Sequence, residues 1–486
     1  MGLDPNMKIL LVEDAKSMRK IEMRILSSIG YENILEANDG EEAVGLLKET
    51  DDIELIISDW NMPNMGGYEL LLWCRKDAKC VHIPFIMATA QADKAQAYKA
   101  QDAGCNGFLP KPFTADDLKG QIEAVLSTEK TETQSTRPSG PQKTASGKVK
   151  LRVAHIQITD HLILGVVKRW IMQGDIVPKH FELDTQCMSG WNPVEKALEK
   201  GEVDAAFVLA PIAMDLFHFG VPIKMVLLTH RNGSIFVRNN QGDYQKPYEN
   251  FFKTKSVLIP HKLSVHHMLT HMFFDPINIK ASLDKGDDVD INLEVVAPIN
   301  MPPFMKESSE VGGFVVAEPI GSISTVSGIS NNLFLSSEIW QNHPCCVVAV
   351  RDDFSEPYSE AVQEFVEYLV DAGKFITEES TLAAFYALSF LDPEKKLGLK
   401  LPVLKQVLTD PLGIKTDNLF PVKNDVERMQ HYMHDIMGVG HIIDIDAFVD
   451  TQYAEIACGD FDYSSHSSEF LNSEEWIRSI LSRSLS

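Results

Sequence analysis

Apolar runs and helical spacings alternate along the first part of the chain. Four short apolar runs have the character of buried strands, at residues 8–12 (KILLV), 54–58 (ELIIS), 84–89 (PFIMAT) and 107–113 (GFLPKPF, a strand followed by a turn). After the first run, Met18, Ile21, Ile25 and Ile29 recur at helical spacing, and Gly30 suits the position just beyond a helix end. This alternation predicts a parallel sheet with helices on both faces.

Residues 127–148 (STEKTETQSTRPSGPQKTASGK) interrupt the pattern, because they contain almost no apolar side chains. A segment rich in Ser, Thr, Pro, Gly and charge cannot bury enough surface to offset its chain entropy. We therefore expect a flexible linker over 128–148, which separates a module at 7–127 from a larger one.

Apolar runs resume after the linker and continue for some 200 residues. The strand candidates are 149–159, 204–210, 224–230, 234–239, 256–260, 311–319 and 344–354. Residues 161–174 (HLILGVVKRWIMQG) predict an apolar-faced helix that ends at Gly174. Near the C-terminus one apolar helical stripe is formed by Val426, Met429, Met433, Ile436 and Met437. We expect a second α/β unit of two lobes at 149–455 and a C-terminal tail or helix at 456–486.

Composition and charge narrow the possible functions of these 486 residues. The formal net charge of -24 argues against a phosphate-binding surface and so against direct nucleic-acid binding. The 7 cysteines show no paired spacing, which argues against a disulfide framework or a zinc site. The start has no apolar signal core, and the apolar window 205–228 contains Asp215 and Lys224, so we expect no membrane span and a cytoplasmic location.

Acidic and basic side chains occur where the strands of the first module end. Glu13 and Asp14 follow the first strand, Asp59 ends another, and Thr89 and Lys111 belong to the last two. Carboxyl ends of parallel strands share one sheet edge, and carboxylates held together there repel unless a cation such as Mg²⁺ intervenes. Asp59 can then accept a phosphoryl group, Lys111 can neutralise its charge and Thr89 can bond its oxygen. The alternative for a single carboxylate is a solvated turn, which explains the whole set poorly.

The segments LLVEDAKSMRK, SDWNMPNMGGYELL, MATA and GFLPKPFTADDLK resemble a two-component receiver domain close to the stand-alone chemotaxis response regulator. The resemblance implies a flavodoxin-like (βα)5 fold and a sensor histidine kinase that phosphorylates Asp59. It implies Mg²⁺ held by Glu13, Asp14, Asp59 and the backbone carbonyl of Asn61. It makes Thr89 and Lys111 the switch pair, with a cis bond between Lys111 and Pro112, and puts Phe108 at the switching aromatic position without a hydroxyl group.

Fragments of residues 149–455 resemble the substrate-binding proteins of nitrate, bicarbonate, sulfonate and thiamine-precursor ABC transporters. They are VAHIQITDHLILGVVKRW, NPVEKALEKGEVDAAFVLAP, VGGFVVAEPIGS, TDNLFPVKNDVERMQHYMHD and IDIDAFVDTQYAE. The resemblance implies a periplasmic-binding-protein-like α/β domain with two lobes around a cleft. A helix N-terminus after ITD would direct free N–H groups at a small oxyanion.

Motif positions make five residues our candidates for that cleft: Thr159, Trp191, Ser234, His266 and Glu318. Each has a simpler interpretation as well, since a lone Trp is more often core and Thr159 can merely cap a helix. Glu318 would repel a bare anion, so nitrate fits poorly, and a neutral or mixed-charge organic ligand is the alternative. Cys345 and Cys346 lie in an apolar run and are interpreted as core.

We therefore predict a cytoplasmic response regulator whose output domain binds a small-molecule solute and acts on a regulatory protein partner. The chain is expected to be no enzyme beyond its own phosphoryl transfer and dephosphorylation. Two alternatives remain: the regulatory domain of a nitrate- or bicarbonate-type transport system, and an enzyme derived from the thiamine-precursor synthase branch. HPCCVVAV (343–350) does not reproduce the Cys-rich motif of that synthase.

Overall fold

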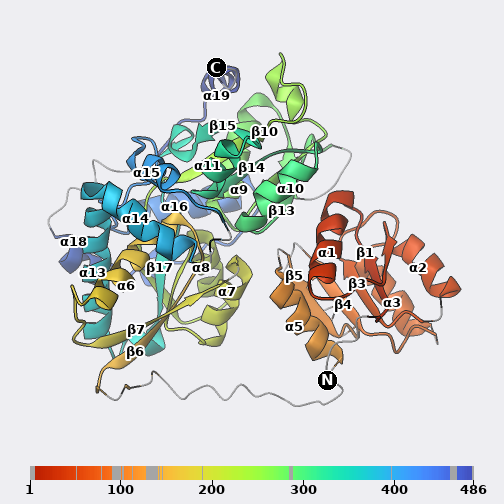
Figure 1. Cartoon of the computed structure of the whole chain (residues 1–486), viewed down its shortest axis with the longest axis horizontal. Coiled ribbons are helices and arrows are strands. Elements are labelled where there is room, and N and C mark those ends of the chain that lie inside the picture. Colours follow the sequence, from red (N-terminus) through yellow and green to blue (C-terminus); the bar gives the residue numbers. More distant parts are fainter. Residues whose placement is uncertain are drawn as a thin grey trace. The chain divides into compact units, whose positions relative to one another are not determined.

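The computed structural model describes residues 6–50, 52–77, 79–89, 100, 103–111, 113–126, 141, 143–144, 146–188, 190–283, 288–393, 395, 397–459 and 468–483. The chain forms two compact units, Met1–Gln134 and Ser135–Ser486, each with its own core (Figure 1). Most of the predicted linker lies outside the described residues, which include only 141, 143–144 and 146–148 of it. None of the helices in the described ranges combines the length and apolar character needed to cross a bilayer.

The first unit is a parallel five-stranded sheet in the order β2-β1-β3-β4-β5, flanked by helices (Figure 1). Its strands are β1 (Ile9–Val12), β2 (Ile34–Ala37), β3 (Leu55–Asp59), β4 (Phe85–Thr89) and β5 (Gly107–Pro110). Its described helices are α1 (Lys16–Ser28), α2 (Gly40–Glu49), α3 (Gly67–Lys76) and α5 (Ala115–Leu126). The four apolar runs predicted as strands coincide with β1, β3, β4 and β5.

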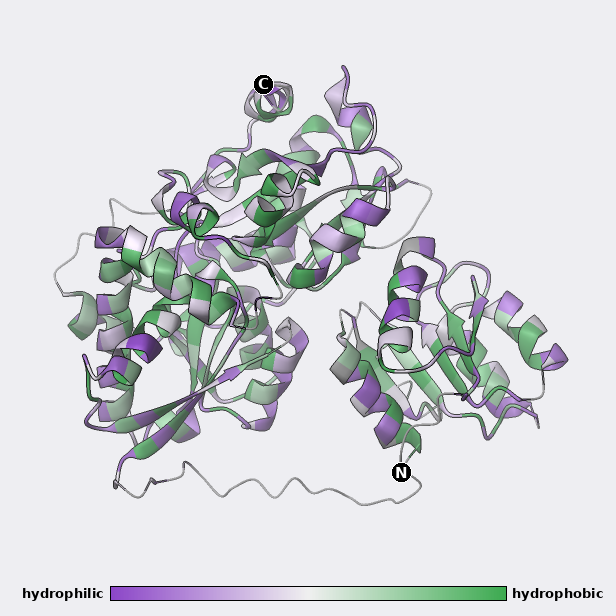
Figure 2. Ribbon diagram, in the orientation of Figure 1, coloured by the Kyte–Doolittle hydropathy of each residue, from purple (hydrophilic) through white to green (hydrophobic). Residues whose placement is uncertain are grey.

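Successive side chains of a strand point to opposite faces of the sheet, and in this sheet both faces are apolar. Leu10 and Val12 of β1 join one buried cluster, and Ile9 and Leu11 join the other. The strands are mainly hydrophobic, whereas the helices beside them carry many hydrophilic residues (Figure 2). A sheet buried on both faces requires continuous apolar runs, which explains why the sequence pattern was easy to interpret.

Helix α1 turns a different side to the sheet from the one that the apolar spacing predicts. The four predicted apolar positions are only half-buried, whereas Arg19, Glu22 and Leu26 are buried. Gly30 has φ +100°, as expected for a residue beyond a helix end. The buried stripe therefore includes two charged residues, which reach the acidic edge of the sheet.

The second unit contains two mixed sheets, one in each lobe (Figure 1). The first lobe has the order β7-β6-β8-β17-β9, with β6 (Val149–His155), β7 (Phe181–Cys187), β8 (Ala205–Leu209), β9 (Ile223–Leu228) and β17 (Cys346–Arg351). Its helices are η1 (Thr159–His161), α6 (Leu162–Gln173), α7 (Trp191–Lys200), α8 (Ala210–His218), α12 (Asp352–Ser355), α13 (Ser359–Glu378) and α14 (Ser380–Leu391). Strand β17 runs antiparallel to both β8 and β9.

The second lobe has the order β12-β13-β11-β14-β10-β15. Its strands are β10 (Ser234–Asn239), β11 (Ser256–Ile259), β12 (Ala281–Ser282), β13 (Ile291–Val295), β14 (Val311–Ala317) and β15 (Ser330–Leu335). Its helices are η2 (Tyr248–Phe251), α9 (Val265–Phe274), η3 (Asp275–Ile277), η4 (Pro298–Asn300), α10 (Met301–Glu307), α11 (Ile320–Val326) and η5 (Ser336–Glu338). The chain passes between the lobes from β9 to β10 and returns at β17.

The C-terminal part packs back onto this unit. It contains α15 (Leu401–Thr409), α16 (Lys423–His431), the π-helix η6 (Tyr432–Ile436), α17 (Ile445–Phe448), α18 (Gln452–Cys458), β18 (Glu469–Phe470) and α19 (Glu474–Arg483). Strand β18 pairs with β16 (Trp340–Gln341), and the hydroxyl of Tyr244 donates to the carbonyl of Leu481 at 2.9 Å. The last helix is therefore part of the second unit's packing.

All seven apolar runs predicted as strands in the second unit overlap strands. The run 149–159 is shorter in the structure, because β6 ends at His155 and η1 begins at Thr159. Strands β7, β13 and β15 were not predicted, since polar residues interrupt the apolar pattern in each of them. The apolar stripe near the C-terminus ends early, because the wider π turn leaves Ile436 58% exposed.

Candidate functional site

Lys111 gathers three carboxylates at the carboxyl edge of the first unit's sheet. Its ammonium nitrogen Nζ lies 3.1 Å from Oδ1 of Asp59 and 2.8 Å from Oε1 of Glu22, and it also pairs with Oε2 of Glu13. Asp59 ends β3, Glu13 follows β1, and Lys111 follows β5, where its backbone N–H donates to the carbonyl of Thr89 at 2.7 Å. The parallel register therefore brings together residues about 100 positions apart.

The site is mostly buried, which sets its electrostatics. Lys111 is 5% exposed and Glu13 3%. Burial opposes the lysine charge, but Asp59, Glu13 and Glu22 outweigh it and hold the pKa of Lys111 well above its usual value. The ammonium therefore stays charged.

Glu22 is a member of this site that the sequence analysis missed. Burial raises the pKa of Glu22 to about 7, opposed by Lys111 and reinforced by Glu13 and Asp59. The available signal was a carboxylate three residues before Ile25 and four after Met18, at the edge of the predicted apolar stripe. This carboxylate could be assigned to the site only through its pairing with Lys111, which is far away in sequence.

The turn after β3 holds Asp59 in place. Oδ2 of Asp59 accepts a hydrogen bond from the backbone N–H of Asn61 at 3.0 Å. Gly67 donates its N–H to the carbonyl of Trp60 at 2.9 Å, and a Cβ at Gly67 would lie 2.0 Å from the carbonyl oxygen of Asp59. Glycine is therefore needed at 67 because the backbone passes directly against the candidate phosphoacceptor.

The remaining receiver candidates surround this group. Asp14 is half-buried and Asn61 exposed, whereas Thr89 is buried at the end of β4. The ring of Phe108 on β5 is half-buried, edge-on to Trp60 with 6.5 Å between centroids. Their metal-binding and switching roles stay predictions. Pro112, and with it the cis bond predicted before it, lies outside the described residues.

The five cleft candidates form two contacting pairs and one separate residue. The backbone N–H and the hydroxyl of Thr159 both donate to the carbonyl of Glu318, at 2.9 and 2.6 Å. Ser234 and His266 share a hydrogen bond of 3.1 Å, and burial lowers the pKa of His266 to about 3, so its ring is neutral. Trp191 is buried at the start of α7, edge-on to His161. Their ligand-binding roles stay predictions.

One small cavity adjoins Glu318. Its volume is about 50 Å³, and its lining includes Glu318, Ser322 and Asp410 but no Lys, Arg or His among the described residues. The Glu318 carboxylate accepts from the hydroxyl and N–H of Ser322 at 2.7 and 3.0 Å. Burial raises the pKa of Glu318 to about 7. Two acids without a cation make this cavity suited to a neutral or cationic group rather than to a bare anion.

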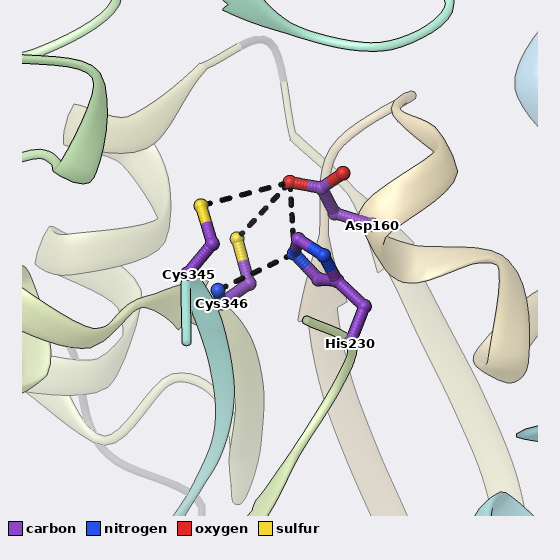
Figure 3. A group of neighbouring side chains, drawn as sticks. All are labelled: Asp160, His230, Cys345 and Cys346. Carbon is purple, nitrogen blue, oxygen red and sulfur yellow. Dashed lines mark hydrogen bonds and ion pairs between the residues drawn. The ribbon is translucent and has the colours of Figure 1, made fainter. Parts of the chain in front are cut away.

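A second polar cluster was not predicted. Asp160, His230, Cys345 and Cys346 come from distant parts of the sequence and converge in the first lobe (Figure 3). The two cysteines are buried, as the core interpretation expected, but they contact a carboxylate. Burial opposes a charge on His230, but Asp160 outweighs it and raises the pKa of His230 to about 10.

Comparisons with known proteins match these two units. The response regulator receiver domain family matches residues 9–123. Chemotaxis protein CheY-3 of Vibrio cholerae serotype O1 is 42% identical over 124 residues, covering 26% of this chain and 95% of that protein. Chemotaxis protein CheY1 of Helicobacter pylori is 43% identical over 122 residues, covering 25% of this chain and 98% of that protein.

The NMT1-like family matches residues 144–388. The zinc-bound ligand binding component of an ABC-type import system from Staphylococcus aureus has a TM-score of 0.55 at 20% identity, covering 63% of this chain and 98% of that one. The periplasmic nitrate-binding protein NrtA from Synechocystis has a TM-score of 0.55 at 14% identity, covering 71% of this chain and 99% of that one. At these identities the likeness shows the fold alone.

The fold and the acidic site define a receiver domain joined to a substrate-binding-protein-like domain. The chain belongs to the NMT1-like family, and its N-terminal unit is a response regulator receiver domain of the CheY type. The expected fold classes, flavodoxin-like and periplasmic-binding-protein-like, are confirmed.

Proposed function

We propose that this chain is a two-component response regulator whose Asp59 receives a phosphoryl group from a sensor histidine kinase. The observation that carries the proposal is the ammonium of Lys111, 3.1 Å from Asp59 and paired with Glu13 at the carboxyl edge of a parallel sheet. A buried lysine whose pKa is raised, beside a 13% exposed carboxylate, supports phosphoryl transfer to that carboxylate.

In the transfer, a carboxylate oxygen of Asp59 attacks the phosphorus of a phosphohistidine. A P–O bond forms and the P–N bond breaks, so that the imidazole leaves with the electron pair and takes up a proton. Lys111 offsets the negative charge that the phosphoryl group adds next to Glu13 and Glu22. The hydroxyl of Thr89 is proposed to bond a phosphoryl oxygen.

The site fits Mg²⁺ for two reasons. Carboxylate oxygens are ligands that Mg²⁺ prefers, and Lys111 carries a single positive charge among three carboxylates. We propose that Glu13, Asp14, Asp59 and the backbone carbonyl of Asn61 hold the ion. When bound, it neutralises charge on the transferred phosphoryl group.

We propose that the switch uses ring packing. Rearrangement of Thr89 and Lys111 around the new phosphoryl group would change the space beside Phe108. The edge contact of Phe108 with Trp60, which itself stacks on Tyr68 at 5.3 Å, supports this route. Phe108 lacks a hydroxyl group, so packing has to carry the signal.

For the second unit we propose solute binding in a cytoplasmic output domain that acts on a protein partner. The proposed limits are 7–127 for the receiver, 128–148 for the linker, 149–455 for the solute-binding domain and 456–486 for the C-terminal segment. All seven cysteines are free, which suits a reducing compartment. The chain would catalyse only its own phosphorylation and dephosphorylation.

The acidic cavity beside Glu318 supports a small organic solute with a neutral or cationic group over nitrate. Thr159, Trp191, Ser234 and His266 remain proposed contacts of the solute. The nitrate-binding neighbour in the comparisons supports the alternative of a small anion, which would require the site to supply a cation or a proton.

Labelling of the full chain by acetyl phosphate tests the receiver. We expect Asp59→Asn to abolish labelling, and Asp52→Asn, which changes a carboxylate paired with Lys8 at 2.7 Å, to retain it. Retained labelling in Asp59→Asn would remove Asp59 as the phosphoacceptor.

Calorimetric titration tests the second unit with nitrate, bicarbonate, an alkanesulfonate and a pyrimidine. We expect binding of the pyrimidine rather than of the three anions, weakened by Glu318→Gln and unchanged by Glu310→Gln, which alters an exposed glutamate. Turnover of a ligand would favour the enzyme alternative, and no binding of any class would contradict solute binding while leaving the receiver proposal intact.

A further inference from the structure

Three separate segments of the second unit meet at one buried point. Asp160 lies in η1 before α6, His230 lies in the segment that leaves β9 for the second lobe, and Cys345 and Cys346 lie at the start of β17 (Figure 3). Backbone hydrogen bonds fix these segments: Thr229 donates to Cys346 at 3.0 Å and Ala210 donates to Cys345 at 2.9 Å. The meeting point is therefore held by the first lobe's sheet.

The side chains converge on one oxygen of Asp160. From Oδ2 of Asp160 the distances are 3.0 Å to Nε2 of His230, 3.9 Å to Sγ of Cys345 and 3.7 Å to Sγ of Cys346. The four donor atoms all lie within 4.8 Å of one another. Tetrahedral Zn²⁺, with bonds of about 2.0 Å to N and O and about 2.3 Å to S, separates its donors by roughly 3.3–3.8 Å.

The thiols of Cys345 and Cys346 can both lie beside Asp160 because only the second of these residues belongs to strand β17. Successive side chains of a strand point to opposite faces, so two adjacent cysteines within β17 would diverge. Cys345 precedes the strand and Cys346 is its first residue, and both sulfurs lie within 4 Å of the same carboxylate (Figure 3). Core packing alone does not require this convergence.

The cluster is buried and leaves polar atoms without hydrogen bonds. Asp160 is 1% exposed, and His230, Cys345 and Cys346 are 0% exposed. Oδ1 of Asp160 and Nδ1 of His230 are both buried and have no hydrogen-bond partner among the described residues. A buried carboxylate with one unpartnered oxygen and two thiols beside it resembles a ligand set more than a satisfied core network.

We propose that Asp160, His230, Cys345 and Cys346 form a closed, four-ligand site for one thiophilic divalent cation, with Zn²⁺ as the ion that this donor set favours. Two sulfurs, one imidazole nitrogen and one carboxylate oxygen are the ligand types that Zn²⁺ takes in proteins. With all four positions filled by protein, the site is structural. It ties η1, the inter-lobe segment and β17 together, and so fixes the base from which the second lobe departs.

The test uses the full chain, stripped of metal by a chelator and then titrated with Zn²⁺ against a metal-binding indicator. We expect one tightly bound Zn²⁺ per chain and a rise in melting temperature. Co²⁺ in place of Zn²⁺ is expected to give the visible absorption of tetrahedral thiolate coordination. A folded wild-type chain that binds no stoichiometric Zn²⁺ would overturn the proposal.

Matched variants assign the ligands. Cys345→Ser and Cys346→Ser are each expected to weaken Zn²⁺ binding at least tenfold and to remove the Co²⁺ spectrum, whereas Cys187→Ser, at an exposed cysteine, keeps both. Unchanged affinity in the two cluster variants would overturn the assignment. Should these variants fail to fold, the Co²⁺ spectrum of the wild-type chain decides, since a spectrum without thiolate bands contradicts the site.

Discussion

Oε1 of Glu22 lies 2.8 Å from Nζ of Lys111, so helix α1 brings a third carboxylate to the lysine that also pairs with Asp59 and Glu13. Glu22 competes with Asp59 for the ammonium group of Lys111, on which the proposed phosphorylation depends. Its carboxylate also adds negative charge beside the position where a phosphoryl group would arrive. The buried side of α1 is therefore part of the site as well as of the core.

We predict that Glu22→Gln speeds labelling of the full chain by acetyl phosphate. The amide keeps the shape of the side chain but removes the charge that Glu22 carries above its pKa of about 7, so above that pH the rate should rise roughly threefold, which corresponds to less than about 1 kcal/mol. The comparison is Glu41→Gln, an exposed glutamate on α2, whose rate should equal that of the wild type. A slower rate in Glu22→Gln would mean that this carboxylate assists the transfer.

Replacing Lys111 should destabilise the first unit. Lys111→Met leaves Glu13, Glu22 and Asp59 close together without their cation, and breaking a buried charge pair in this way costs about 3–5 kcal/mol. Hydrogen exchange of the β1 and β3 peptides in the full chain would measure the loss. Lys119→Met, at an exposed site on α5, should leave exchange unchanged, and equal protection in both variants would contradict the prediction.

Gly67, in the turn after β3, and Gly45, in helix α2, allow a test of the turn with a matched control. In Gly67→Ala the new Cβ would lie 2.0 Å from the carbonyl of Asp59, so the turn must move and labelling of Asp59 should fall sharply. Gly45→Ala meets no atom within 4 Å inside α2, and it should stabilise the unit by about 0.5–1 kcal/mol. Thermal unfolding and acetyl-phosphate labelling of both variants check this contrast. Normal labelling in Gly67→Ala would show that the turn tolerates displacement.

The second unit should lose stability on acidification. Burial lowers the pKa of His261 and His266 to about 3, below the value of about 6.5 expected in an unfolded chain. The unfolded state then binds more protons as the pH falls below about 6.5, so the free energy of unfolding decreases in that direction.

Scanning calorimetry of the full chain at a series of pH values would measure this decline. His261→Asn should lessen it, because an amide oxygen can accept the N–H of Leu263, which bonds Nδ1 of His261 at 3.0 Å, without taking up a proton. His180→Asn, at an exposed site, should decline as the wild type does. A melting temperature that stays constant between about pH 7 and about pH 5 would contradict the prediction.

Local patterns determined much of this protein. The continuous apolar runs of β1, β3 and β4 predicted strands because a parallel sheet buries both faces. The order of Glu13, Asp59, Thr89 and Lys111 at the strand ends predicted their gathering at one edge, since parallel strands align their carboxyl ends. Gly30 and Gly174, both with positive φ, marked helix ends through their backbone freedom alone.

Only the tertiary structure decided the rest, because it depends on contacts between distant segments. The pairing of buried Glu22 on α1 with Lys111 joins residues that no helical period relates. The convergence of Asp160, His230, Cys345 and Cys346 requires η1, the lobe connection and β17 to meet. Spacing rules look for ligands that are neighbours in sequence, and here only the two cysteines are, so the sequence argued against the zinc site that we propose. Sequence patterns capture periodic burial and local turns, whereas electrostatic partners are chosen by how the elements pack.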